Sequence, residues 1–153
     1  MLAQAVERGD LALDDNLGTL LQGKVTLTSP EVASITLRQL ITHSSCLARV
    51  PPDFLEGQVQ DNPFSTYDRR RLWAALSSLK LEGAPPCMAS YSNFGMGIVG
   101  EILSERYGKP WHVLVHENIT DPLGMHDTVQ LMGDRASRMA HGFNLNSAVT
   151  PPS

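Results

Sequence analysis

The sequence contains no long apolar run. Within its 153 residues, no apolar stretch approaches the roughly 20 residues that a membrane-spanning helix needs. Its first ten residues, MLAQAVERGD, have neither a basic start nor an apolar segment, so we expect no signal peptide in this chain. Basic residues are also scarce, since 12 Lys and Arg face 16 Asp and Glu. The net charge of −4 argues against nucleic acid or an anionic membrane as a partner.

Cysteine is equally scarce. Cys46 and Cys87 are the two cysteines, and they form neither a C-x-x-C pair nor a zinc signature. We therefore expect two free thiols, which leave the redox compartment open. With 42% hydrophobic and 18% charged residues, the chain is expected to be globular, and its length fits one domain.

Several catalytic and cofactor motifs are missing. The sequence has no G-x-S-x-G nucleophile elbow, and HENIT at 116–120 is not H-E-x-x-H. His112 and His116 are spaced i, i+4 and can in principle bind a metal with Glu117, but two histidines on a solvated helix face are the commoner case. We expect no metal and no cofactor.

One glycine pattern is present. Residues 95–100 read G-x-G-x-x-G, which is the dinucleotide-binding pattern. That site needs a β-strand before the glycines, whereas the preceding APPCMASYSN holds two prolines and no apolar strand pattern. We interpret Gly95, Gly97 and Gly100 as positions that let a helix pack closely.

The apolar periodicity predicts a mostly helical chain with long loops and few strands. A helix is expected from about 92 to 106 and to end at Gly108. Its buried residues should be Ile98, Val99, Ile102 and Leu103. The N-terminal segment has the pattern of the last turns of an amphipathic helix, and we expect the chain to be a piece of a longer protein.

Local signals mark the other helices. Thr36 and Gln39 have the spacing of a capping box, which predicts a helix ending near His43. Residues 44–64 are expected to be loop. Ser65 is predicted to cap the following helix, with Asp68 three positions on.

An S-x-x-K match occurs once, at Ser77 to Lys80. A lysine one turn after a serine can accept the hydroxyl proton if burial and neighbouring charges lower the lysine pKa. A nucleophile gains from a helix N-terminus, but this match falls at a predicted helix end. We interpret it as a helix end with a cation in the last turn.

Tyr91-Ser92-Asn93 opens the segment YSNFGMGIVGEILSERYGKPW, which lies between ITLRQLITHSS and ITDPLGMHDT. These segments, in this order and spacing, resemble the serine β-lactamase and penicillin-binding-protein-like family. The branch is that of class C β-lactamases, related esterases and D-alanyl-D-alanine peptidases. The resemblance runs from about Leu2 to Pro152 and does not identify the substrate.

The resemblance implies a three-part active site: an S-x-x-K, a Y-x-N loop, and a later K-T-G or H-x-G strand. The Y-x-N tyrosine shuttles protons and the asparagine orients the lysine and the substrate, so Tyr91 and Asn93 are the candidate catalytic residues. By family register, Ser77 and Lys80 are not the nucleophile pair, and the third motif is absent. The implied fold for 1–153 is one partial domain, the helical subdomain of the β-lactamase/transpeptidase-like α+β fold, with few or no strands of the main sheet.

The function implied is that of a serine hydrolase fragment. The complete protein would hydrolyse β-lactams, esters or D-amino peptides through an acyl-enzyme, and relatives are often periplasmic or secreted. One alternative is a non-catalytic helical module that forms a homo-oligomer through exposed apolar surface. Another is a minimal hydrolase that uses Ser77, Lys80 and Tyr91.

Two loops depart from the family pattern. Cys46 and Ala48 stand where relatives have glycine and proline, and Pro85-Pro86 stands where they have Pro-Gly. Glycine adopts positive φ, which cysteine and proline do not easily adopt. We therefore expect these loops to differ in shape from those of relatives.

Overall fold

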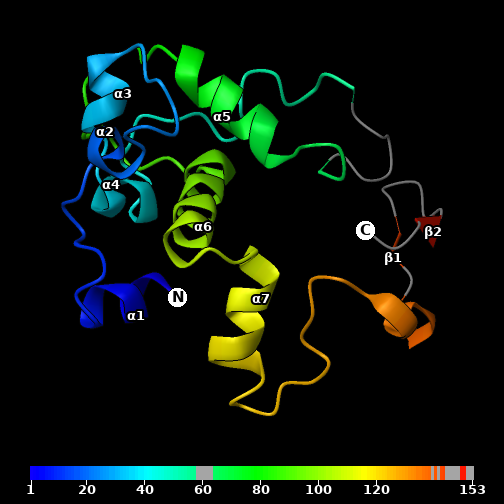
Figure 1. Ribbon diagram of the computed structural model, residues 1–153. Coiled ribbons are helices and arrows are strands. Elements are labelled where there is room, and N and C mark those ends of the chain that lie inside the picture. The colour runs from blue at the N-terminus through cyan, green and yellow to red at the C-terminus, as the bar shows by residue number, and fades with distance from the viewer. Residues whose placement is uncertain (58–63, 139, 141, 144–148, 151–153) are drawn as a thin grey trace.

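Helices joined by long loops make up most of the structure, a computed structural model that describes residues 1–57, 64–138, 140, 142–143 and 149–150 (Figure 1). The helices are α1 Leu2–Glu7, α2 Leu17–Leu20, α3 Pro30–Ser34, α4 Leu37–Ile41, α5 Arg69–Ser78, α6 Asn93–Tyr107, α7 Trp111–Val115, the π-helix η1 His116–Thr120 and the 3₁₀-helix η2 Gly133–Arg138. Within the described residues, the strands are β1 Gly142–Phe143 and β2 Val149–Thr150, an antiparallel pair. The predicted mostly helical fold with few strands is confirmed.

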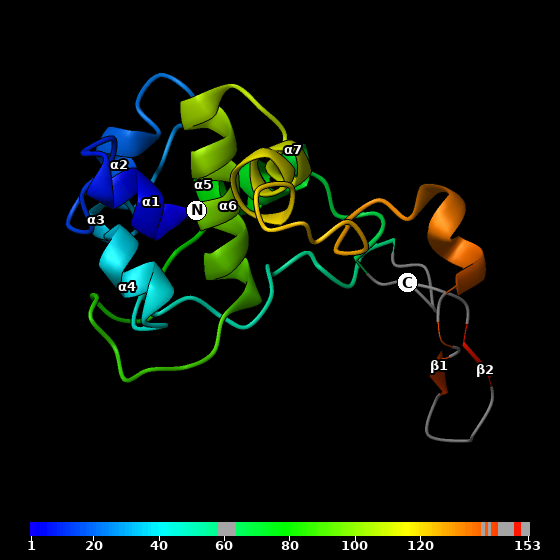
Figure 2. The ribbon, with the colours of Figure 1, turned by 90° about the horizontal axis from the view of Figure 1, so that it is seen from below.

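Helix α6 is the centre of the helical cluster. Helices α4, α5 and α7 pack against it, and both views show α6 between α4 and α7 (Figures 1 and 2). Its buried side chains include the four predicted from periodicity, together with that of Phe94: Phe94, Ile98, Val99, Ile102 and Leu103. Each such side chain contributes about 1.5–3 kcal/mol relative to an exposed position, so this helix anchors the fold.

Caps are present at both ends of α6 and at the start of α4. The Ser92 Oγ accepts a hydrogen bond from the backbone N–H of Gly95 at 3.0 Å. Gly108 ends α6 in the left-handed conformation, with φ of 64°. At α4, both hydrogen bonds of the predicted box between Thr36 and Gln39 are present. The predicted end at Gly108 and the predicted capping box are confirmed, whereas the Ser92 cap was not predicted.

Helix α5 begins later than predicted. Its N-cap is Asp68, whose Oδ1 accepts a hydrogen bond from the Arg71 N–H at 2.9 Å, so the prediction of Ser65 as the cap is wrong. The reason is tertiary: Tyr67 is held outside the helix by a hydrogen bond to Asp53, 2.7 Å long. The predicted loop 44–64 contains no helix over 44–57, and its residues 58–63 lie outside the described part.

The glycines of α6 do not mark a close approach between helices. A Cβ added at Gly95, Gly97 or Gly100 would lie 3.5 Å or more from its nearest neighbouring atom, which is ordinary van der Waals contact. The prediction that these glycines are needed for close packing is therefore wrong. Gly97 faces Leu72 of α5, whereas Gly100 faces Trp111 of α7.

None of the described helices combines the length and the apolar character needed to cross a membrane.

Candidate active site

The Tyr91-Ser92-Asn93 triplet forms the entry to α6, and its middle residue anchors it. Ser92 is buried, and its Oγ donates a hydrogen bond to the Ala48 carbonyl at 2.7 Å while capping the helix. Asn93 is the first residue of α6 and is half-buried. Tyr91 is 55% exposed. The buried serine thus fixes the backbone from which Tyr91 and Asn93 project.

A second loop, residues 43–50, lies along the segment that leads into α6. Backbone hydrogen bonds join this loop to the segment before α6 at both ends. At one end, the Cys87 N–H donates to Ser44 O and the Ser90 N–H to His43 O, each at 2.9 Å. At the other end, Arg49 O accepts from the N–H groups of Asn93 and Phe94 at 2.9 and 3.2 Å. We call residues 43–50 the support loop. The position of the triplet depends on this loop, which is more than 40 residues away in sequence.

A disulfide between Cys46 and Cys87 links the same two segments, with 5.2 Å between the Cα atoms. The prediction of two free thiols is wrong. A separation of 41 residues has no motif spacing, and the pairing arises because the Cys87 N–H to Ser44 O bond brings the two backbones together. The cross-link therefore belongs to the architecture of the candidate site.

The support loop has two left-handed residues, His43 at φ 58° and Cys46 at φ 63°. The expectation that cysteine avoids this conformation is therefore wrong for Cys46. Left-handed backbone costs a non-glycine residue about 1–2 kcal/mol. Cys46 is held by its own disulfide and by the hydrogen bonds that the Ser44 and Ala48 carbonyls accept on either side of it. The Pro85-Pro86 peptide bond is cis.

The Tyr91 ring is supported by two side chains of this loop. The His43 ring lies 4.8 Å away between centroids, at an interplanar angle of 46°. The Arg49 Cζ lies 5.4 Å from the Tyr91 centroid, which is cation–π distance. The His43 Nδ1 also accepts the Ser92 N–H at 3.3 Å. Neither residue was predicted to belong to the site, although His43 lies in the segment ITHSS that carries part of the resemblance.

Ser77 lies in the last turn of α5, and Lys80 follows the end of that helix. Ser77 contacts the segment before α3, and not the support loop. The Ser77 Oγ donates a hydrogen bond to the Thr26 carbonyl at 2.5 Å, and the Ser77 carbonyl accepts from the Thr28 Oγ at 2.8 Å. Lys80 is exposed. This geometry fits a helix end tied to a neighbouring loop, as its position in the sequence indicates.

The two histidines of α7 and η1 line a groove beside residues 125–135. The His116 Nδ1 lies 3.2 Å from the Thr120 Oγ1, and the Glu117 carboxylate accepts a hydrogen bond from Lys109 at 2.6 Å. No three side chains in the described residues have the arrangement to hold a metal ion.

Comparisons with known proteins identify relatives of nearly the whole described chain. The family model Beta-lactamase matches residues 1–131. The D-alanyl-D-alanine-carboxypeptidase/endopeptidase AmpH of Escherichia coli (strain K12) is 34% identical over 128 residues, which are 84% of this chain and 32% of that protein. This chain thus spans about a third of the length of that relative.

Solved structures give the same picture. The β-lactamase/D-alanine carboxypeptidase of Yersinia pestis superposes with a TM-score of 0.79 at 25% identity, over 97% of this chain and 42% of that one. A class C β-lactamase of Rhodobacter sphaeroides superposes with a TM-score of 0.71 at 27% identity, over 99% of this chain and 40% of that one.

Proposed function

Because this chain belongs to the β-lactamase family, we propose that it forms the helical part of a serine hydrolase acting on β-lactams, esters or D-amino peptides. Residues 1–153 would be one partial domain of that enzyme. The relatives named above are a D-alanyl-D-alanine carboxypeptidase/endopeptidase and β-lactamases, which are acyl-transfer enzymes of these classes.

In the proposed reaction, a serine hydroxyl attacks the substrate carbonyl, the C–N or C–O bond breaks, and an ester joins enzyme and acyl group. Tyr91 would relay the proton that the attacking serine loses to the leaving nitrogen or oxygen, so that its own phenol is restored at the end of the step. Water then attacks the ester, and its hydroxyl adds to the acyl carbon while the serine regains a proton. Asn93 would orient the substrate and the motif lysine.

The observation that carries the proposal is the presentation of Tyr91. Its side chain is exposed, while Ser92 is buried, and the ring contacts His43 and Arg49. A tyrosine kept for packing would be buried. An exposed phenol on a segment held by a disulfide and backbone hydrogen bonds is instead suited to proton transfer, because pre-organisation limits the reorganisation needed during reaction.

The test uses a chimera of the relative AmpH, which is about three times as long, in which the matching residues of this chain replace their counterparts. We expect Tyr91→Phe to slow acylation by benzylpenicillin or a p-nitrophenyl ester by roughly 10²–10⁴-fold, the range for a lost general acid or base. Tyr107→Phe is the matched control, because that phenol binds Asp10 at 2.8 Å at the far end of α6. Acylation of the Tyr91 variant at the wild-type rate would refute the proposal.

The exposed apolar side chains support a second proposal, self-association of this chain as a helical module. Leu55, Met88, Leu123 and Leu131 are each at least 65% exposed. Large apolar side chains that stay exposed in the single chain can be buried by association with another copy. Light scattering coupled to size exclusion, at several concentrations, should then show a mass that rises with concentration; a constant monomer mass would rule this out.

The disulfide supports an oxidising compartment for the protein, such as the periplasm or the extracellular space. Disulfides persist there and are rare where thiols are kept reduced. Thiol trapping of the protein from intact cells tests this, since the proposal requires Cys46 and Cys87 to be protected from alkylation before reduction.

A further inference from the structure

Two side chains that contact the Tyr91 ring lie on either side of Cys46 in the support loop. His43 precedes Cys46 and contacts the ring at 4.8 Å between centroids. Arg49 follows Cys46, and its Cζ lies 5.4 Å from the ring centroid. Cys46 itself is bonded to Cys87, which belongs to the segment that leads to Tyr91. The disulfide therefore joins the loop that supports Tyr91 to the segment that carries it.

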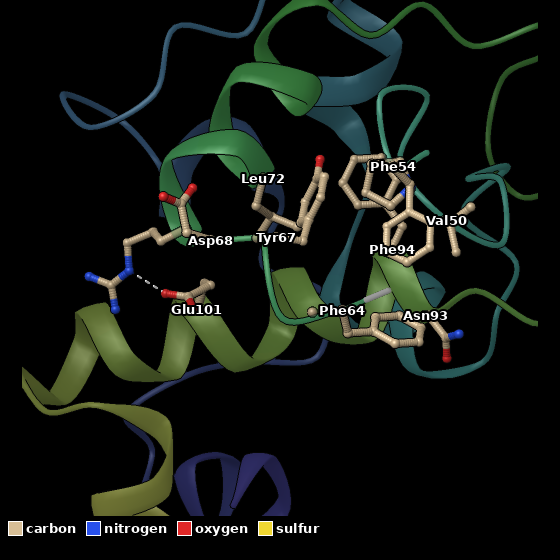
Figure 3. A pocket seen from close by; sticks show the side chains of 12 residues that line it. Val50, Phe54, Phe64, Tyr67, Asp68, Leu72, Asn93, Phe94 and Glu101 are labelled. Atoms are coloured by element: carbon tan, nitrogen blue, oxygen red, sulfur yellow. Dashed lines mark ion pairs between the residues drawn. The ribbon is translucent and has the colours of Figure 1, made fainter. Parts of the chain in front are cut away.

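The Arg49 end of the support loop is anchored by packing as well as by hydrogen bonds. The Arg49 carbonyl accepts bonds from the N–H groups of the first two residues of α6, at 2.9 and 3.2 Å. Val50 lines the aromatic pocket, a cavity of about 230 Å³. The rings around this pocket are those of Phe54, Phe64, Tyr67 and Phe94 (Figure 3). These contacts hold the Arg49 end without help from the disulfide.

The His43 end of the support loop lies beside a more exposed segment. Its backbone carbonyls accept hydrogen bonds from the N–H groups of Cys87 and Ser90, and the His43 Nδ1 accepts from Ser92. Among these donors, Ser90 is exposed, and the neighbouring Met88 is 93% exposed. Because water competes for hydrogen bonds at exposed positions, such bonds contribute little net stability. The position of this end therefore depends on the disulfide.

Cys46 adopts a backbone conformation that suits glycine. Its φ of 63° lies in the left-handed region, which residues with a Cβ disfavour by a factor of roughly 5–30. The cross-link holds Cys46 in this conformation, and opening the cross-link removes that constraint. Cys46 and Cys87 are half-buried rather than buried, so a small thiol can reach their sulfur atoms.

We propose that the Cys46–Cys87 disulfide is a redox switch that controls the proton relay of Tyr91. The oxidised form keeps the support loop in contact with the Tyr91 ring. In the reduced form, Cys46 leaves the left-handed conformation and the His43 end of the loop separates from the ring. The inference rests on the proposed hydrolase function, which gives Tyr91 its role in proton transfer.

The reductant is a dithiol. One of its thiolates attacks a cysteine sulfur, the Sγ–Sγ bond breaks, and the other cysteine sulfur leaves with the electron pair and takes up a proton. The second thiolate of the reductant then displaces the first cysteine from the mixed disulfide, and this cysteine is protonated in turn. The protein gains two electrons and two protons, and the dithiol is oxidised to a disulfide.

Acylation of the AmpH chimera by benzylpenicillin, with and without dithiothreitol, tests the switch. We expect reduction to slow acylation at saturating penicillin by roughly 5–30-fold, the factor by which left-handed backbone is disfavoured. The half-saturating concentration should change less than about twofold, because a misplaced proton relay affects the chemical step rather than binding. Reoxidation should restore the rate. An unchanged rate, after alkylation and mass analysis show both thiols reduced, would overturn the proposal.

Two double variants of the chimera are matched controls. Glycine adopts left-handed backbone without a penalty, so Cys46→Gly with Cys87→Ser should acylate within about threefold of the oxidised rate. Cys46→Ser with Cys87→Ser should be as slow as the reduced protein. Neither variant should respond to dithiothreitol, and a response equal to that of the wild type would overturn the proposal. A serine variant as fast as the oxidised protein would also overturn it.

NMR of this chain with labelled tyrosine separates the switch from the proposed function. Reduction should shift the ring signals of Tyr91, whereas those of Tyr107, whose phenol bonds to Asp10, should stay in place. If the Tyr91 signals shift but the chimera is not acylated in either redox state, the hydrolase proposal fails and the loop movement stands. If Tyr91-dependent acylation is equal in both redox states, the switch fails and the hydrolase proposal stands.

Discussion

Tyr67 links the segment before α5 to the loop that contains Asp53 and Phe54. Its phenol donates to Asp53, and its ring contacts Phe54 and Arg71. Tyr67→Phe keeps the ring but leaves an acceptor without its donor. We expect a loss of about 0.5–1.5 kcal/mol in the free energy of unfolding, the usual value of one hydrogen bond, measured by urea denaturation at neutral pH. An unchanged free energy of unfolding in Tyr67→Phe would contradict this contribution of the hydrogen bond.

The same residue gives the fold a dependence on alkaline pH. Burial, followed by the hydrogen bond to Asp53, raises the pKa of Tyr67 well above its ordinary value near 10. A raised pKa means that the folded protein holds this proton more tightly than the unfolded chain does. The stabilisation is therefore complete below about pH 10 and is lost as the pH rises toward the folded-state value.

Denaturation between about pH 8 and pH 11.5 checks the sign. Wild-type stability should fall above about pH 10, and the fall should be shallower in Tyr67→Phe, which has lost one of the linked protons. Burial also raises the pKa of Tyr107, so part of the fall should persist in the variant. An identical slope in both proteins would contradict the linkage.

At the scale of elements, the support loop and the entry to α6 act as one unit. Removing the disulfide frees a loop of 41 residues in the unfolded chain, so Cys46→Ser with Cys87→Ser should cost about 2–4 kcal/mol of stability. Hydrogen exchange should also quicken at the Ser90 and Ser92 amides, which both bond to His43. Unchanged exchange at these two amides would show that the hydrogen bonds alone fix the loop.

Helix α6 provides a paired prediction with opposite signs. Gly100 lies inside the helix with room for a Cβ, so Gly100→Ala should raise the free energy of unfolding by about 0.5–1 kcal/mol. Gly108 ends the helix at φ 64°, so Gly108→Ala should lower it by about 1–2 kcal/mol. Chemical denaturation of the two variants and the wild type tests both predictions. Changes of the same sign and size in their free energies of unfolding would contradict the conformations of Gly100 and Gly108.

The elements that sequence reasoning predicted are those with local causes. The capping box of α4, the end of α6 at Gly108 and the apolar face of α6 depend on residues within a few turns of one another, and they are where the sequence predicted them. The start of α5 was misplaced because Tyr67 is held by Asp53, 14 residues away. The Cys46–Cys87 link and the support of Tyr91 by His43 and Arg49 join segments more than 40 residues apart, and no periodicity encodes such contacts.

In the candidate site, too, residues in short sequence motifs could be predicted, whereas contacts between distant segments could not. Tyr91 and Asn93 could be proposed from a triplet and its surroundings, because the family resemblance is carried by short segments. The aromatic pocket could not, since Phe54, Tyr67 and Phe94 come from three separate segments that meet only in the folded chain. Asn93 lies near these aromatic side chains only because the folded chain brings their segments together.

At the scale of the whole molecule, we propose that Tyr91 and Asn93 serve the proposed hydrolysis and that Ser77 does not supply its nucleophile. The chain spans about a third of the length of its relative AmpH. The S-x-x-K match within it is tied to another segment, since the Ser77 hydroxyl donates to Thr26 and Lys80 is exposed. Neither feature prepares Ser77 as a nucleophile, because its proton acceptor is a carbonyl and its lysine is solvated.

Intact mass after incubation with benzylpenicillin, for the wild-type chain and Ser77→Ala side by side, tests this most directly. We predict no covalent adduct on either protein, and an adduct only on the AmpH chimera, provided that it supplies a family-register S-x-x-K. A penicilloyl adduct on the wild-type chain that disappears in Ser77→Ala would contradict it, and would make Ser77 with Lys80 the nucleophile pair of a minimal hydrolase.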